Sequence, residues 1–300
     1  MKREDFLKTL GIAAVAGAAM KLSALNRVME AGENTETMPV LFVGHGSPMN
    51  AIEENTFTKQ MKSVAASIAI PKAILMVSAH WETKGTFVTN QELPPTIHDF
   101  GGFPKALFDV EYPAHGSSWL VDETKSTVKK TAVEGSDKWG LDHGCWSVAK
   151  NMYPNADVPI MQLSLDYSKD AQYHYDLAKE LAALRDKGVL IIGSGNMVHN
   201  LGMMQLKSGD INEPFGLDWA LEARAKFKEL IDKKDHASLI KYNALGKSVQ
   251  LSVPTPEHYL PLLYTLALQD KDDELTYFND EAIAGSLTMT SVEIKRKKKG

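Results

Sequence analysis

The chain has 300 residues, 44% of them hydrophobic, which is enough to bury one large core. Its formal net charge of -5 argues against a nucleic-acid partner, because phosphate binding needs clustered Lys and Arg, and the one basic cluster, 295–299, is expected to be a solvated, frayed end. A single cysteine, Cys145, excludes an internal disulfide framework and a cysteine-based zinc site, so His and oxygen ligands must hold any metal.

Residues 1–37 differ from the rest and are expected to be a signal-like segment followed by a polar linker. A basic start with Arg3 precedes an apolar run at 10–20 that is too short to span a bilayer. This layout resembles a twin-arginine export signal, although Glu4 stands where the second arginine is expected. The alternative is an amphipathic helix on a cytoplasmic protein. The sequence therefore leaves two locations open, the cytoplasm and the periplasm, and predicts no integral membrane span.

From residue 38 to residue 300 we expect one domain, in which short apolar runs alternate with amphipathic segments. Alternating strands and helices of 10 to 20 residues indicate βαβ units, so we predict a three-layer α/β/α fold around a mostly parallel or mixed sheet. The expected strands are 40–43, 73–79, 86–89, 158–165, 189–192 and 285–294. The expected helices are 57–65, 171–187 closed by Gly188, 219–231, and one that opens at 255–261 with Pro261 in its first turn.

Five of the nine histidines lie at the predicted ends of these elements: His45, His80, His143, His199 and His258. For any one of them, a hydrogen-bonded turn residue is as good an interpretation as a ligand. In open α/β sheets, however, ligands bind beyond the carboxyl ends of the strands, where several of these imidazoles are expected to meet. His174 and His236 fall on helices with polar neighbours and are predicted to lie on the surface.

A divalent metal is the natural occupant of such a cluster. Histidine nitrogens with at most one carboxylate suit zinc or non-haem iron(II), whereas calcium and magnesium prefer oxygen cages. No short zinc motif of the His-Glu-x-x-His type is present. The Pro- and Gly-rich stretch 93–116, which carries His98, Asp99 and Phe103, is long enough to be a binding loop or a lid.

Six motifs together resemble the class III extradiol ring-cleaving dioxygenases, and within them the 4,5-DOPA extradiol dioxygenase branch. The similarity covers residues 38 to about 294. The motifs are VGHGSPM around His45, SAHW at His80, PTIHDFGGFP at His98, LDHGCW at His143, SGNMVHNL at His199 and PTPEHYLPLLY at His258.

The resemblance implies a mononuclear non-haem metal with His45, His80 and His258 as ligands. His199 matches a residue that is either a further ligand or the acid/base histidine. Related enzymes use a glutamate as third ligand, and because Glu257 adjoins His258, the identity of that ligand stays open.

The implied reaction inserts both atoms of O2 into a catechol such as DOPA, next to but outside the diol. His199 is the preferred acid/base and His143 the second choice, since an imidazole changes protonation state near neutral pH. Asp99 and Asp142, each beside a histidine, are expected to orient imidazoles. Phe100 and Trp146 are further candidates for the wall of an aromatic-ring pocket, with core packing as the alternative. The residues expected to bind the substrate are His98, Asp99, Phe103 and Tyr259.

Iron(II) is expected for ring cleavage, because zinc cannot pass electrons to O2, although zinc is a possible occupant. Two other functions stay open at this point. One is a zinc hydrolase that uses metal-bound hydroxide, and the other is a metal-binding protein without turnover on the same scaffold. The expected partners are a small catechol and O2, and the sequence does not indicate the oligomeric state.

Overall fold

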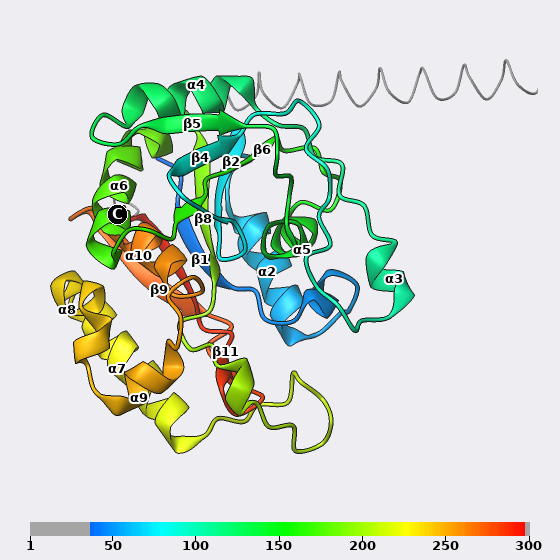
Figure 1. The fold of residues 1–300 in the computed structure, drawn as a ribbon, viewed down its shortest axis with the longest axis vertical. Helices are drawn as coiled ribbons and strands as arrows, with labels where there is room; N and C mark the ends of the chain where they lie inside the picture. The colour runs from blue at the N-terminus through cyan, green and yellow to red at the C-terminus, as the bar shows by residue number, and fades with distance from the viewer. Residues whose placement is uncertain (1–36, 298–300) are drawn as a thin grey trace, which may run out of the picture.

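The structure is a computed structural model that describes residues 37–297, and its centre is a six-stranded mixed sheet (Figure 1). Four neighbouring strands of the sheet run parallel to one another, and the two strands at one edge are each antiparallel to their inner neighbour. In sheet order the strands are β6 (Ile160–Gln162), β2 (Ala73–Ser78), β8 (Val189–Gly195), β1 (Val40–Gly44), β12 (Ser291–Arg296) and β9 (Asp273–Phe278). The prediction of a mostly parallel or mixed sheet is confirmed.

The inner strands are apolar along their whole length because both faces of the sheet are covered. In β1, Val40 and Phe42 enter one core and Leu41 and Val43 the other, as the two-residue period of a strand requires. On one face lie α2 (Thr56–Ser67) and α5 (His143–Met152); on the other lie α6 (Ala171–Glu180), α7 (Asp218–Asp232) and α10 (Leu260–Ala267). The predicted three-layer arrangement is therefore confirmed (Figure 1).

Shorter elements surround these layers. Three two-stranded sheets pair β3 (Glu82–Thr83) with β7 (Leu165–Asp166), β4 (Thr86–Thr89) with β5 (Val133–Ser136), and β10 (Ala282–Ile283) with β11 (Leu287–Thr288). The remaining α-helices are α3 (Lys105–Phe108), α4 (Ser118–Thr127), α8 (His236–Ile240) and α9 (Lys247–Ser252). Four 3-10 helices complete the set: η1 (Pro48–Ala51), η2 (Leu181–Lys187), η3 (Leu201–Met203) and η4 (Tyr242–Ala244).

Four sequence predictions need correction. The strand expected at 158–165 is divided between β6 and β7, and the final strand expected at 285–294 is divided between β11 and β12. The helix expected at 171–187 becomes a 3-10 helix after Glu180, and it ends at Gly188, which adopts the left-handed backbone conformation with φ of 83°. The first two residues of the basic cluster are ordered, because Lys295 and Arg296 belong to β12 and pair with Glu293 and Asp270, while 298–299 lie outside the described residues.

The predicted signal-like segment lies outside the described residues, except for Thr37. Within residues 37–297, no helix combines the length and the apolar character that a membrane crossing requires.

The strand register prepares the functional site. Gly44 at the end of β1 lies opposite Gly195 at the end of β8, and Ser78 at the end of β2 lies opposite Ser194. Three carboxyl ends are thus level at one edge of the sheet, and the histidines that follow them leave the sheet at the same height.

Candidate metal centre

Four imidazoles from distant parts of the chain meet at this edge. His45 follows β1, His80 lies two residues beyond β2, His143 opens α5, and His258 precedes α10. The ring centres of His45, His80 and His258 are 5.0–5.3 Å apart, and the ring of His143 lies 3.8 Å from that of His80. The structure therefore brings the three predicted ligands into one cluster, together with one predicted acid/base.

Two glycines permit this close assembly. A Cβ atom on Gly195 would lie 2.2 Å from the carbonyl oxygen of His258, which also accepts a hydrogen bond from the N–H of Asn196 at 2.9 Å. A Cβ atom on Gly144 would lie 2.5 Å from Ser78 Oγ and 2.8 Å from the His80 ring. The absence of side chains at these positions lets the end of β8 and the first turn of α5 approach the cluster.

The hydrogen bonds of Ser194 fix the tautomer of His45. Ser194 Oγ donates its single proton to the carbonyl oxygen of Gly144 at 2.6 Å, so it must accept the hydrogen bond that joins it to His45 Nδ1 at 3.0 Å. His45 therefore carries its proton on Nδ1. Its Nε2 atom presents a lone pair.

Asp99 fixes two further imidazoles in the same way. One carboxylate oxygen accepts from the backbone N–H and from Nδ1 of His143, both at 2.9 Å, and the other faces His80 Nδ1 at 3.3 Å. Burial alone would raise the pKa of Asp99, but the hydrogen bonds and charge of His143 lower it, so the group stays a carboxylate. His80 and His143 then also carry their protons on Nδ1 and offer Nε2.

These tautomers create a donor set that fits a metal ion. The Nε2 atoms of His45 and His80 lie 3.2 Å apart, and each presents a lone pair to the other. Two lone pairs at this distance repel unless a cation lies between them. Neighbouring nitrogens of a tetrahedral site with metal–nitrogen bonds of about 2.0–2.1 Å are about 3.3 Å apart, so the spacing suits a shared ion.

His258 and His199 complete the site on the other side. His258 Nδ1 lies 3.2 Å from Glu257 Oε1, an arrangement that again leaves Nε2 for the cluster. The His199 ring stacks on the His258 ring at 3.5 Å with an angle of 5° between the planes. Potential ligand atoms of His199, Glu257 and His258 all lie within 4.8 Å of one another, and the same holds for His45, His80 and His143.

The surroundings keep His45, His80, His199 and His258 neutral, which is the form that binds metals. Burial lowers the pKa of His45 and of His258 well below the usual value, and neighbouring histidines lower both further. Burial also lowers the pKa of His80, and that of His199 to about 4. Burial and the neighbouring imidazoles therefore disfavour the protonated form of each of these four histidines.

Partly exposed aromatic rings extend from His143 along the 93–116 loop. The ring centre of Phe100 lies 5.6 Å from that of His143 and 5.4 Å from that of Phe103. His98 contacts Phe100 at 5.8 Å and directs Nε2 to the carbonyl oxygen of Val110 at 2.9 Å. His98 and Phe103 thus lie near the cluster, while Phe100 makes the direct contact with His143.

Two residues do not lie where the sequence placed them. Tyr259 was expected beside the substrate, but its ring is fully buried against Phe227 and Tyr242, and its hydroxyl donates to the Leu239 carbonyl oxygen at 3.0 Å. It belongs to the core, because consecutive residues at the start of a helix point in different directions. His174, predicted to lie on the surface, is fully buried and hydrogen-bonded to Tyr264.

The sequence reasoning missed Ser194 and Ser78. Ser78 Oγ donates to Asp142 Oδ1 at 2.6 Å and accepts from the N–H of His80 at 3.2 Å. Ser78 is the last residue of β2 and Ser194 is the second-last residue of β8, directly before the site. That position is the one signal that would have marked them.

Comparison with known proteins agrees with this geometry. The family described as the catalytic LigB subunit of aromatic ring-opening dioxygenase matches residues 38–276. A 4,5-DOPA dioxygenase extradiol from Escherichia coli strain K12 is 43% identical over 258 residues, which cover 86% of this chain and 94% of that protein. The 4,5-DOPA dioxygenase extradiol of Beta vulgaris is 35% identical over 237 residues, covering 77% of this chain and 87% of that one.

A solved structure shares the fold. The crystal structure of an uncharacterized protein from Escherichia coli K12 superposes with a TM-score of 0.71 at 37% sequence identity, and it covers 85% of this chain and 99% of its own. The resemblance carried by the six motifs is thereby confirmed. The chain belongs to the LigB family of extradiol aromatic ring-opening dioxygenases.

Proposed function

We propose that this protein opens the ring of a DOPA-like catechol at a bond next to the diol, and that both atoms of O2 enter the product. The observation that carries the proposal is the set of buried imidazoles whose Nδ1 atoms are held by Ser194, Asp99 and Glu257, so that Nε2 is left for a metal. The class of catechol is taken from the relatives, two of which are 4,5-DOPA dioxygenases.

His45, His80 and His258 are the residues that would hold the ion, with Asp99 and Glu257 behind two of them. A ferrous ion, when bound, supplies a chelating centre for the diol and the electrons that O2 activation requires, which zinc cannot supply. Three neutral ligands leave a site with more positive charge than a site with a carboxylate ligand. That charge favours a catechol that has lost protons.

His199 is the proposed acceptor of the diol proton. It is partly exposed and stacked beside His258, and within residues 37–297 no hydrogen bond ties its ring nitrogens to another group. His143 is the second proton-transfer residue, because Asp99 fixes its tautomer and aims Nε2 at the cluster. Phe100 and Phe103 would line the side of the pocket that contacts the ring of the catechol.

The test is to load the purified protein with iron(II) and L-DOPA without oxygen, and then to admit O2. The expected result is O2 consumption with a yellow ring-opened semialdehyde, and no product from the zinc-loaded protein. His258→Ala should lose both metal and activity, whereas His199→Asn should keep the metal and lose turnover. If the iron-loaded protein consumes no O2 with any of several catechols, ring cleavage is not its activity.

A further inference from the structure

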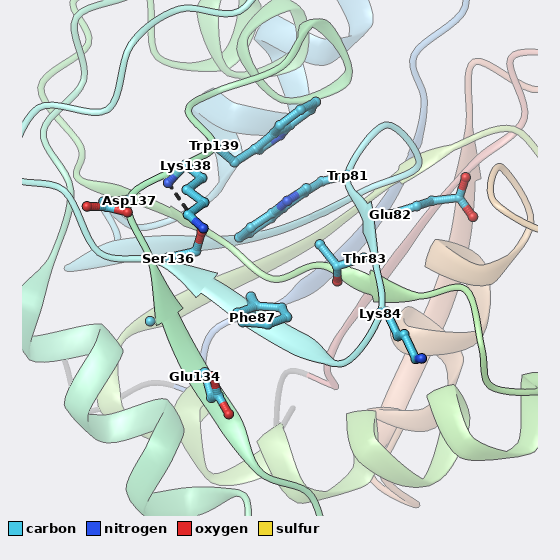
Figure 2. Close-up of a pocket in the computed structure, with 11 residues that line it drawn as sticks. Trp81, Glu82, Thr83, Lys84, Phe87, Glu134, Ser136, Asp137, Lys138 and Trp139 are labelled. Carbon is cyan, nitrogen blue, oxygen red and sulfur yellow. Dashed lines mark hydrogen bonds between the residues drawn. The ribbon is translucent and has the colours of Figure 1, made fainter.

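A second cleft lies apart from the histidine cluster, between β3, β4 and β5 (Figure 2). Its volume is about 540 Å³, which is in the range of small-molecule sites. None of the histidines of the metal centre lines it. We call it the tryptophan cleft, after the two indole rings that define it, Trp81 and Trp139.

Flat aromatic surfaces form its walls. Figure 2 shows the indole rings of Trp81 and Trp139 lying face to face. The angle between their planes is 3°, and their ring centres are 6.3 Å apart. Trp81 is only 3% exposed and serves as a floor, while Trp139 and Phe87 are partly exposed and remain accessible. Such surfaces favour a planar apolar ring over a flexible aliphatic chain.

The rim carries charges of both signs. Lys84 and Lys138 provide two cations, and Glu82, Glu134 and Asp137 provide three anions. Within the described part of the chain, no ion pair engages any of these five charged groups. A ligand with one ammonium and one carboxylate group can pair with side chains of both signs on this rim. A ligand with a single charge can pair with side chains of one sign only.

We infer that the tryptophan cleft is a binding site for a zwitterionic aromatic amino acid, separate from the metal centre. Trp139 and Phe87 receive the ring above the floor that Trp81 forms, and the mixed rim receives the charged end. This inference does not rest on the proposed ring cleavage. If the protein binds such a ligand in the cleft but opens no catechol ring, the inference still holds.

The cleft is also joined to the metal centre by hydrogen bonds, which affects the choice of variants. Trp139 Nε1 donates to Asp142 Oδ2 at 3.1 Å, and Asp142 in turn accepts from Ser78, which contacts the backbone of His80. Replacing Trp139 therefore changes more than the cleft wall. A second variant that alters only the exposed rim, Glu134→Gln with Lys138→Gln, separates the two effects.

The test is equilibrium binding of L-tyrosine to the full chain, measured by titration calorimetry. L-Tyrosine has a single ring hydroxyl, so it cannot chelate a metal through a diol. One saturable site per chain is expected, retained in His258→Ala and weakened about tenfold in Trp139→Leu, since stacking on an accessible ring is lost. The rim variant should weaken binding about threefold. Trp119→Leu, at a 38% exposed tryptophan on α4 outside the cleft, is the matched control and should bind normally.

Two ligand analogues sharpen the result. Tyramine lacks the carboxylate and 3-(4-hydroxyphenyl)propionate lacks the ammonium, so both should bind more weakly than L-tyrosine. The inference is overturned if L-tyrosine shows no saturable binding up to its solubility limit. It is overturned equally if binding disappears in His258→Ala but persists in the rim variant, because the ligand would then occupy the metal centre.

Discussion

Replacing Asp99 by asparagine is expected to weaken metal binding, although the shape of the side chain is kept. The carboxylate accepts two hydrogen bonds from His143, and its other oxygen faces His80 Nδ1 at 3.3 Å. An amide has only one accepting oxygen. If that oxygen serves His143, the NH2 group faces His80 Nδ1, which must give up its proton to accept, and the proton then moves to Nε2.

The size of the effect follows from this tautomer change. A protonated Nε2 on His80 cannot bind a metal, and loss of a carboxylate behind a ligating histidine typically weakens affinity by about 10- to 100-fold, or about 1.4–2.7 kcal/mol. Asp99→Ala should weaken binding no more than Asp99→Asn does, because a water molecule in the vacated space can still accept from both imidazoles.

The assay is competition between the protein and a calibrated chelator for iron(II) or zinc. Asp109→Asn is the matched control, since Asp109 is exposed and pairs only with Lys105. Affinity of Asp99→Asn within about twofold of the unaltered protein would refute the assignment, because it would mean that Asp99 does not set the tautomer of a ligand.

Three further predictions concern the scaffold. Asp273→Asn should destabilise the protein by about 3–5 kcal/mol, read from urea unfolding, because it leaves the buried Arg185 without its ion pair of 2.7 Å; an unchanged midpoint would contradict this. Burial lowers the pKa of His174 to about 4, so between pH 6.5 and 4 the unfolded chain binds more protons and stability falls as pH falls. In His174→Asn the contribution of His174 to this loss of stability, up to about 3 kcal/mol, should be missing from the pH dependence of the free energy of unfolding. An unaltered slope would count against this prediction. Gly195→Ala should push the His258 backbone outward and reduce metal affinity, with an overpacking penalty of about 1–3 kcal/mol in unfolding, whereas retention of full affinity would show that the contact can relax.

The parts of the fold that the sequence predicted are those with a local signal. The runs that became β1, β2 and β8 are apolar throughout and end at glycine or serine, so both the strands and the positions of His45 and His80 could be read directly. His174 could not be placed, because its burial depends on a contact with Tyr264, ninety residues further along the chain. Its polar neighbours on the helix instead predicted a position on the surface.

The same limit applies inside the site. The role of Ser194 depends on the Gly144 carbonyl oxygen, which only the assembled fold brings near. Asp99 was expected to orient an imidazole and to bind substrate. Its loop is held beside the start of α5 by backbone hydrogen bonds from Ile97 N–H to the Leu141 carbonyl oxygen and from Leu141 N–H to the Pro95 carbonyl oxygen. Its carboxylate faces His80 and His143.

The order of strands in the sheet has a consequence for how the protein is made. β1 is the first sheet strand to be synthesised, yet Val40 pairs with Ile191 on one side and Ile294 on the other. For most of translation an apolar strand therefore has two bare edges, a state that invites aggregation and calls for chaperone cover. His258 is also among the last residues to leave the ribosome. A metal site that includes His258 would therefore be complete only in the nearly finished polypeptide, and the metal supply of the compartment where folding ends would decide which ion enters it.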